Sequence, residues 1–253
     1  RAPFFVYAGT LAVAGGIGLL FLTKASLHDV DTSTSRAPAV TLPQALRVSG
    51  YRAALTSNLG NGWALFGVRS SLIPLFVTEG IGASATWTGI GFFVSAAAQG
   101  GLLLVAGSFT DRVGRRPALL IGGAAATVSM LGLALSDSLV VYTVAMALFG
   151  AGAAFLSVAP SAVVGDVVHG KGGTVVAAFQ MSADLGAVVG PLVAGELADR
   201  YSFGAAFGVT AGVVAAGLLT AFLSTETRRV PGADDETVDS GGVDAEPAPG
   251  TTG

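Results

Sequence analysis

Long apolar stretches alternate with short polar segments along most of the chain. Each of seven such stretches carries at most one charged residue and extends for about 20 residues, the length that a helix needs to cross roughly 30 Å of hydrocarbon. These stretches cover residues 4–22, 53–78, 87–107, 117–135, 139–164, 174–195 and 203–224. The pattern therefore predicts an all-α, polytopic membrane protein with seven transmembrane helices.

The composition agrees with this pattern. Hydrophobic residues make up 52% of the chain and charged residues 11%, against about 25% charged residues in soluble domains, and the mean hydropathy is +0.71. The sequence has no cysteine, which excludes disulfides and thiol chemistry, and its two histidines do not make a convincing metal site. It contains no nucleotide-binding loop and no nucleophile elbow. We therefore expect no enzyme, no bound cofactor or metal, and no nucleic-acid partner.

Basic residues are concentrated on one side of the predicted membrane. If the link 24–52 lies inside the cell, ten of the thirteen lysines and arginines lie on that side, as the positive-inside rule expects. These ten are Lys24, Arg36, Arg47, Arg52, Arg112, Arg115, Arg116, Lys171, Arg228 and Arg229. The asymmetry predicts a multi-pass protein of the plasma membrane with a cytoplasmic C-terminus. Residues 230–253 hold six acids and no base, together with prolines and glycines, which predicts a disordered acidic tail.

A weak internal repeat links the two ends of the predicted bundle. The segment GSFTDR at 107–112 recurs as GELADR at 195–200, 88 residues later, and Pro74 is matched by Pro160, 86 residues later. An odd number of crossings separates the two copies, so they lie on opposite sides of the membrane. This arrangement is an inverted 3+3 repeat, which is typical of secondary transporters.

The link between the third and fourth predicted helices carries an unusual concentration of charge, in the segment GSFTDRVGRRPALL. This segment resembles the cytoplasmic loop signature of the major facilitator superfamily, known as motif A, at every defined position. The matching positions are Gly107, Asp111, Arg112, Gly114, Arg115 and Arg116. The segment GAVVGPLVAG at 186–195 is similar to the Gly-x-x-x-Gly-Pro signature of antiporter members, and ETRR at 226–229 resembles the usual family ending.

The resemblance implies which part of the family fold this chain represents. In a twelve-helix member the signature follows the second and eighth helices, whereas here it follows the third predicted helix, so the chain would span the sixth to the twelfth helix and be a fragment of a longer protein. Residues 1–23 would be the last helix of the N-terminal half, 24–52 the central cytoplasmic loop, 53–225 the C-terminal six-helix bundle, and 226–253 the tail. The missing N-terminal half, the lipid bilayer and a small-molecule substrate would be its partners.

The charged residues of the loop have two interpretations. Gly114 permits a reversal between antiparallel helices, and Asp111 can accept hydrogen bonds from arginines or from free N–H groups at a helix start. The arginines can also simply anchor the loop at the anionic inner leaflet. The resemblance implies a conformational latch instead, in which Asp111 and the arginines clamp the cytoplasmic helix ends in one conformation and release them in the other. It also implies that the helix partner of this loop lies in the missing half.

Asp184 and Arg69 are the charged residues within the predicted spans. Asp184 lies about ten residues, or roughly 15 Å, along its helix and therefore close to the bilayer midplane, where an unpaired carboxylate is costly. It is a candidate proton-coupling acid or cation ligand in a central cavity, or alternatively a structural acid bonded to neighbouring helices. A pair between Arg69 and Asp184 would have to bridge a difference in depth of about 8 Å.

Neutral polar residues and a glycine-proline segment complete the candidates. Neutral polar side chains inside a membrane either line a cavity or bond neighbouring helices to each other; those here are Asn58, Asn61, Gln99 and Gln180. The segment 186–195 can serve close helix packing or a gating kink, because small residues allow close approach and proline removes a backbone hydrogen bond. Its candidate residues are Gly186, Gly190, Pro191 and Gly195.

These features predict a secondary active transporter that works by alternating access, with proton-coupled efflux of small organic molecules as the favoured function. The proton gradient, rather than a cofactor, would supply the energy. A sugar, nutrient or metabolite importer of the same fold is an alternative, although only Trp63 and Phe66 offer rings for stacking on these helices. A non-transporting membrane receptor or scaffold is a second alternative, which would tolerate the loss of Asp184.

Overall fold

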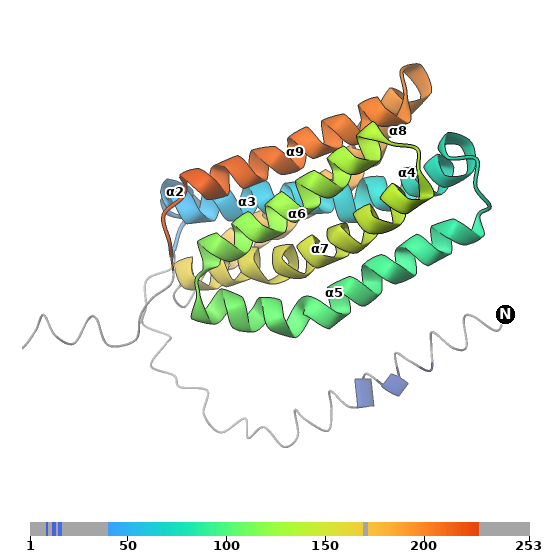
Figure 1. Ribbon diagram of the computed structural model, residues 1–253. Helices are drawn as coiled ribbons and strands as arrows, with labels where there is room; N and C mark the ends of the chain where they lie inside the picture. Colours follow the sequence, from blue (N-terminus) through green and yellow to red (C-terminus); the bar gives the residue numbers. More distant parts are fainter. Residues whose placement is uncertain (1–8, 10–11, 14, 17–39, 169–171, 228–253) are drawn as a thin grey trace, which may run out of the picture. The chain divides into compact units, whose positions relative to one another are not determined.

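The computed structural model describes residues 9, 12–13, 15–16, 40–168 and 172–227 (Figure 1). Most of the predicted span 4–22 and nearly all of the predicted tail lie outside these residues. The chain divides into two units, 1–38 and 39–253, and the second unit contains the helices described below. In chain order these are α2 (Leu42–Arg47), α3 (Ser49–Asn61), η3 (Gly62–Val68), α4 (Arg69–Leu75), η4 (Phe76–Gly80), α5 (Thr86–Arg112), α6 (Arg115–Leu135), α7 (Leu139–Val167), α8 (Gly173–Arg200) and α9 (Phe203–Leu223).

Five of these helices, α5 to α9, are long and apolar enough to cross a membrane. They correspond to the last five predicted spans, which are confirmed as helices. Polar residues set their ends: α5 ends at Arg112, and Ser202 accepts a hydrogen bond from the backbone N–H of Ala205 at the start of α9. The predicted span 53–78 falls on α3, η3, α4 and η4, which follow one another from 49 to 80 without a non-helical residue between them.

This first helix of the bundle is irregular along its length. It changes from α to π geometry at η3 and again at η4. Pro74 lies inside α4 and has no N–H to donate to the preceding turn, so it cannot support regular α-helical bonding just before η4. Short π segments within α-helices frequently occur at functional sites, and η3 is the part of this helix that packs most extensively on α8.

The inverted repeat is visible in both the helix bounds and the packing. The bounds of α6 and α9 differ by 88 residues at both ends, and α5 and α8 end 88 residues apart at Arg112 and Arg200. The helix 49–80 packs mainly against α8 and α9, whereas α7 packs mainly against α5 and α6. The first helix of each three-helix unit therefore contacts the second and third helices of the other unit, and neither unit can form this packing alone.

The closest backbone-to-backbone contacts in the bundle obey the same symmetry. A Cβ atom on Gly62 would lie 2.1 Å from the carbonyl oxygen of Ala183 in α8, and a Cβ atom on Gly150 in α7 would lie 2.1 Å from the carbonyl oxygen of Ser95 in α5. The two glycines are 88 residues apart, and so are their two neighbours. The same backbone-to-backbone crossing therefore occurs twice. Within a membrane such close packing, rather than the hydrophobic effect, holds helices together.

Gly62→Ala and Gly150→Ala are each expected to destabilise the protein by about 1–3 kcal/mol, because the added methyl group would push two helix backbones apart. The matched control is Gly101→Ala in α5, where an added Cβ would meet no atom within 4 Å. The measurement is thermal unfolding of the purified variants in detergent, followed by tryptophan fluorescence. A Gly62 or Gly150 variant as stable as the Gly101 variant would contradict the proposed crossing.

Candidate functional site

The motif loop joins the end of α5 to the start of α6 at one end of the bundle (Figure 1). Gly114, the residue before α6, has a φ of +141°, a backbone conformation that residues with a side chain rarely adopt. A Cβ atom there would also lie 2.4 Å from Oε2 of Glu226. The backbone conformation therefore requires glycine at this position, and a side chain there would also displace the carboxylate of Glu226. Gly107, by contrast, has open space around its Cβ position.

Arg115 is the centre of the ionic contacts in this loop. Its Nε donates to Oδ2 of Asp166 at 2.8 Å, its Nη2 donates to Oδ1 at 3.4 Å, and its Nη1 donates to the carbonyl oxygen of Thr110 at 2.9 Å. Nη1 also lies 3.4 Å from Oδ1 of Asp111. The side chains of Arg115 and Asp166 are 15% and 18% exposed, whereas that of Asp111 is 72% exposed. The Arg115–Asp166 pair is therefore shielded from solvent, and it joins α6 to α7.

Glu226, just after α9, caps the start of α6. Its carboxylate accepts hydrogen bonds from the backbone N–H groups of Arg115 at 2.9 Å and Arg116 at 3.1 Å. N–H groups in the first turn have no partner within their own helix, and the positive end of the helix dipole favours a carboxylate there. In return, Nη2 of Arg116 donates to the carbonyl oxygen of Phe222 at 2.6 Å, and its guanidinium lies 5.8 Å from the centre of the Phe222 ring. The start of α6 and the end of α9 thus cap each other.

These contacts give the loop's arginines partners within this chain. The resemblance alone assigns the helix partner to the missing half, but Arg115 and Arg116 already contact α7 and α9 of this chain. Asp166 and Glu226 are not among the predicted latch residues. Glu226 is the first residue of the ETRR segment, which resembles the usual family ending, so the resemblance already marked this residue as a candidate. Asp166 is an acid at the end of a predicted span on the same side as the loop, which is the sequence signal for a partner of the arginines.

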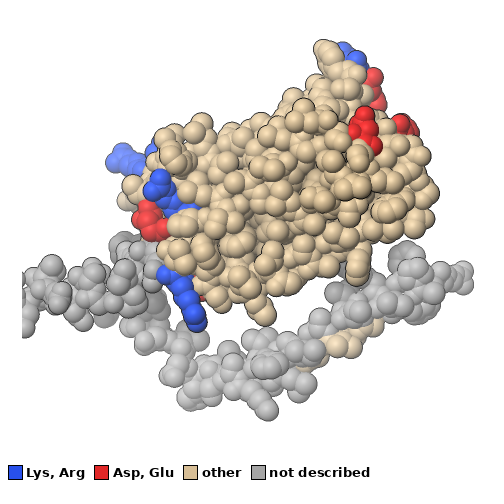
Figure 2. Space-filling model, viewed as in Figure 1, with Lys and Arg blue, Asp and Glu red and all other residues tan. Residues whose placement is uncertain are grey.

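On the face shown in Figure 2, charged side chains gather at the two ends of the bundle. Described arginines at the loop end are Arg47, Arg52, Arg112, Arg115 and Arg116, which belong to α2, α3, α5 and α6. At the other end, Arg200 forms an ion pair with Glu196. The uneven distribution of basic residues along the sequence therefore corresponds to an uneven distribution between the two ends of the folded bundle.

Asp184 and Gln180 lie on a face of α8 that the described helices do not cover. Both side chains are exposed, and so are those of their apolar neighbours Met181, Leu185 and Val188. Among the described residues, no hydrogen bond or ion pair reaches Asp184. No bond from Asp184 to another helix is therefore present in the described part of the chain.

Arg69 points to a different part of the bundle from Asp184. Its Nη2 donates to the carbonyl oxygen of Phe92 in α5 at 3.4 Å, and its guanidinium lies 5.0 Å from the centre of the Phe92 ring. Cation–π contact and a carbonyl acceptor both stabilise a desolvated guanidinium. The ion pair between Arg69 and Asp184 that the sequence allows is therefore absent from the described part of the chain.

Two of the other three neutral polar candidates connect helices. Nδ2 of Asn58 donates to the carbonyl oxygen of Phe179 at 2.8 Å and lies 3.3 Å from Oγ of Ser182, so it joins α3 to α8. Nε2 of Gln99 donates to Oγ of Ser157 at 3.3 Å and joins α5 to α7. Asn61 is buried. For Asn58 and Gln99, the contacts correspond to interhelical bonding.

The glycine-proline segment of α8 lies at the crossing with η3. A Cβ atom on Gly186 would lie 2.2 Å from the carbonyl oxygen of Leu59, and one on Gly190 would lie 2.9 Å from that of Trp63. Pro191 lies inside α8, and its ring faces Gly67, whereas Gly195 has open space around it. Gly186 and Gly190 therefore serve close packing, and they bring a proline-containing turn against a π-helical segment.

Comparison with known proteins agrees with this geometry. The family model of the Major Facilitator Superfamily matches residues 54–248. Because this match covers most of the chain, the protein belongs to the Major Facilitator Superfamily.

Individual relatives point to the same family at greater distance. The multidrug resistance protein MdtG of Serratia proteamaculans is 27% identical over 166 residues, which is 64% of this chain and 39% of that protein. MdtG of Citrobacter koseri is 28% identical over 166 residues, with 64% of this chain and 40% of that protein covered. The chain thus spans about 40% of the length of these curated relatives.

Solved transporter structures share the fold. A crystal structure of a peptide transporter, POT, in complex with sulfate has a TM-score of 0.63 at 20% identity and covers 83% of this chain and 46% of its own. A POT family transporter in complex with 5-aminolevulinic acid has a TM-score of 0.60 at 20% identity and covers 74% of this chain and 42% of its own. The matched region is a little under half of each of these transporters.

Asp166→Asn is expected to destabilise the protein by about 1–3 kcal/mol, because the shielded guanidinium of Arg115 would lose its charged acceptor. Asp111→Asn removes a carboxylate from the same arginine at a largely exposed position and should cost no more than about 0.5 kcal/mol. Unfolding of both variants in the same detergent provides the comparison. Equal losses of stability would show that the Arg115–Asp166 contact is not the main ionic contact of the loop.

Proposed function

We propose that this chain is the C-terminal part of a twelve-helix transporter that exports small organic molecules, drugs among them, in exchange for protons. Membership of the Major Facilitator Superfamily supports transport by alternating access. The relatives named multidrug resistance proteins support export of drug-like molecules. In this proposal the N-terminal half supplies the other wall of the substrate cavity.

The observation that carries the proton coupling is the position of Asp184. It lies in the middle of an apolar helix, on an uncovered face, and the described residues provide no partner for it. A carboxylate at this depth is tolerated if it is protonated, paired across the bundle or in contact with a water-filled cavity. A cavity between the two halves meets this requirement. Asp184 can then take up a proton from one side of the membrane and release it to the other as the cavity changes its opening.

The motif loop has a separate role in this proposal. The positive-inside rule supports a cytoplasmic location for the loop end of the bundle, and thus for the C-terminus. The Arg115–Asp166 pair and the Glu226 cap keep the ends of α6, α7 and α9 together within this half. The largely exposed carboxylate of Asp111 is then the group available to the N-terminal half when the cytoplasmic side closes.

The structure offers less support for an importer of sugars. Of the two rings that could stack on a sugar, Trp63 is 8% exposed and its indole N–H donates to Oγ1 of Thr210 inside the bundle. Only Phe66, which is 61% exposed, is accessible for stacking. No observation on the described residues favours a receptor or scaffold, and such a protein would function without Asp184.

Asp184→Asn in the complete transporter is expected to reduce proton-driven transport to background while leaving the folded protein intact. The measurement is accumulation of a fluorescent drug such as ethidium in inside-out vesicles with an imposed pH gradient. Asp184→Glu should restore part of the transport, because it restores a titratable carboxyl group. Glu196→Gln, which removes an exposed acid at a helix end, is the matched control and should transport normally. Undiminished, pH-dependent transport by Asp184→Asn would contradict the proposal.

A further inference from the structure

The charge of Arg69 is not neutralised by any acid in the described part of the chain. Arg69 lies nine residues, or roughly 13 Å, before the end of the predicted span 53–78, which places its guanidinium inside the hydrocarbon layer. None of the ion pairs formed by the described residues includes it. Charged side chains at such a depth face the bundle interior or a water-filled cavity, and they mark the pathways of substrates or ions. Arg69 is therefore a candidate to bind a negatively charged ligand.

The contacts of Arg69 use only part of its hydrogen-bonding capacity. A guanidinium carries five N–H donors. Its Nη2 donates to the carbonyl oxygen of Phe92 at 3.4 Å, which is longer than the distance of about 2.7–3.2 Å that is usual for N–H···O bonds. Its Nε is buried and has no hydrogen-bond partner among the described residues. Because buried polar groups in folded proteins are nearly always hydrogen-bonded, the guanidinium requires a further acceptor.

The side of α5 that faces Arg69 carries hydroxyl groups with the same property. Thr88 and Ser95 lie four residues before and three residues after Phe92, and therefore on the same side of the helix. Their hydroxyl oxygens are buried and have no hydrogen-bond partner in the described part of the chain. Hydroxyl groups can donate to an anion. The surface of α5 toward Arg69 thus contributes neutral donors and leaves the positive charge of the guanidinium in place.

Arg69 is half-buried rather than enclosed. Phe66 and Ser70, which lie three residues before it and one residue after it, are both exposed, and Phe66 is 61% exposed. The ring of Phe92, over which the guanidinium lies, belongs to a residue that is itself half-buried. The surroundings of the guanidinium are therefore uncovered on one side, where aromatic rings offer apolar contacts.

The inverted repeat relates this uncovered surface to the one that carries Asp184. Phe93 and Ala96 are exposed on α5, and they precede Met181 and Asp184, which are exposed on α8, by 88 residues in each case. The two helices thus leave equivalent surfaces uncovered. In the proposed transporter the N-terminal half lies against the uncovered face of α8, and the equivalent surface of α5 faces it as well.

We propose that Arg69 binds the acidic group of an organic anion in the cavity between the two halves, so that the substrates of this transporter include organic carboxylates. The guanidinium fits a carboxylate through two parallel hydrogen bonds, and the exposed ring of Phe66 contacts the apolar part of the molecule. This inference rests on the proposed function, because it names a class of substrate for the same cavity. It adds a substrate-binding residue that is separate from the proton coupling by Asp184.

The test is a pair of fluorescence titrations of the purified complete transporter with dansylglycine and dansylglycinamide, which differ only in that the carboxylate of the first is a neutral amide in the second. The wild type should bind dansylglycine more tightly. Arg69→Gln should weaken dansylglycine binding about tenfold, through loss of charge-assisted hydrogen bonds, and leave dansylglycinamide binding unchanged, which also shows that the variant is folded. Arg69→Lys should keep part of the preference, because it keeps the charge but loses the planar fork.

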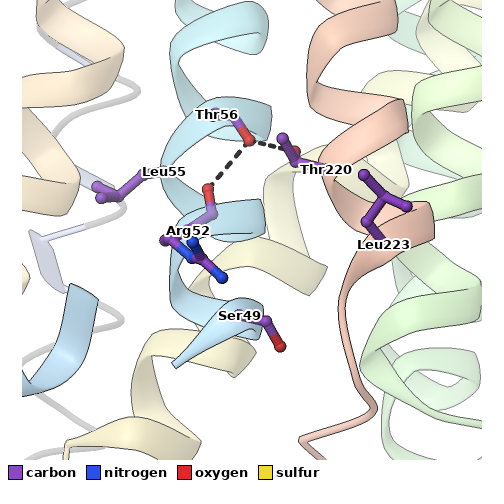
Figure 3. Close-up of a pocket in the computed structure, with 6 residues that line it drawn as sticks. All are labelled: Ser49, Arg52, Leu55, Thr56, Thr220 and Leu223. Atoms are coloured by element: carbon purple, nitrogen blue, oxygen red, sulfur yellow. Dashed lines mark hydrogen bonds between the residues drawn. The ribbon is translucent and has the colours of Figure 1, made fainter. Parts of the chain in front are cut away.

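Arg52→Gln is the matched control. Arg52 belongs to the same helix 49–80, and Figure 3 shows it in the first turn of α3, beside a hollow of about 380 Å³ between α3 and α9. Its side chain is exposed, and none of the ion pairs formed by the described residues includes it. The substitution removes the same charge at the end of the bundle, and it should leave the binding of both dyes nearly unchanged.

Three results would overturn the proposal. Equal weakening of both dyes by Arg69→Gln would mean that Arg69 supports the cavity or pairs with an acid of the N-terminal half. Equal effects of Arg69→Gln and Arg52→Gln would indicate diffuse charge attraction. A wild type that bound both dyes equally, or neither, would have no carboxylate site. The titrations need no proton gradient, so normal transport by Asp184→Asn would contradict the proposed function without changing these results.

Discussion

The bundle depends on the direct approach of helix backbones at two equivalent crossings. Lipid tails are as apolar as leucine, so helices in a membrane gain little from hiding hydrophobic side chains from water, and close contact has to supply the attraction. Glycine at 62 and 150 permits that contact against Ala183 and Ser95. Each crossing joins one three-helix unit to the other. The two units are therefore interleaved, and neither has a hydrophobic core of its own.

The close helix crossings also explain which polar residues bond between helices and which lie on the uncovered face of α8. Side chains near the crossings, such as Asn58 and Gln99, are drawn into bonds between helices. On α8, Gly186 and Gly190 turn one side of the helix toward η3 and thereby leave Asp184 on the uncovered side. The position of the candidate proton-coupling acid is therefore a consequence of where the small residues of its helix lie.

The sequence allowed the helices to be predicted well and the partners of charged residues poorly. The predicted spans from residue 53 onward agree with the described helices because polar residues bound each apolar stretch. The repeat was recoverable because its two copies keep a constant offset. The sequence placed Asp184 inside a helix, as α8 confirms, but could not show which face it lies on, because that depends on packing with η3. It also allowed a pair between Arg69 and Asp184, whereas Arg69 contacts Phe92 in α5. Nor could it show that Arg115 binds Asp166 more closely than Asp111, because that depends on how α7 packs against α6.

The mutual cap between α6 and α9 means that the fold does not end with its last span. Glu226 lies three residues beyond the end of α9, yet it accepts the hydrogen bonds of two amides at the start of α6. A variant truncated after Leu223 would keep every hydrophobic segment, and a count of the predicted spans would not reveal that anything was missing. It would nevertheless leave the first turn of α6 without its acceptor. The folded part of the chain therefore extends at least to a polar residue that hydropathy alone would assign to the tail.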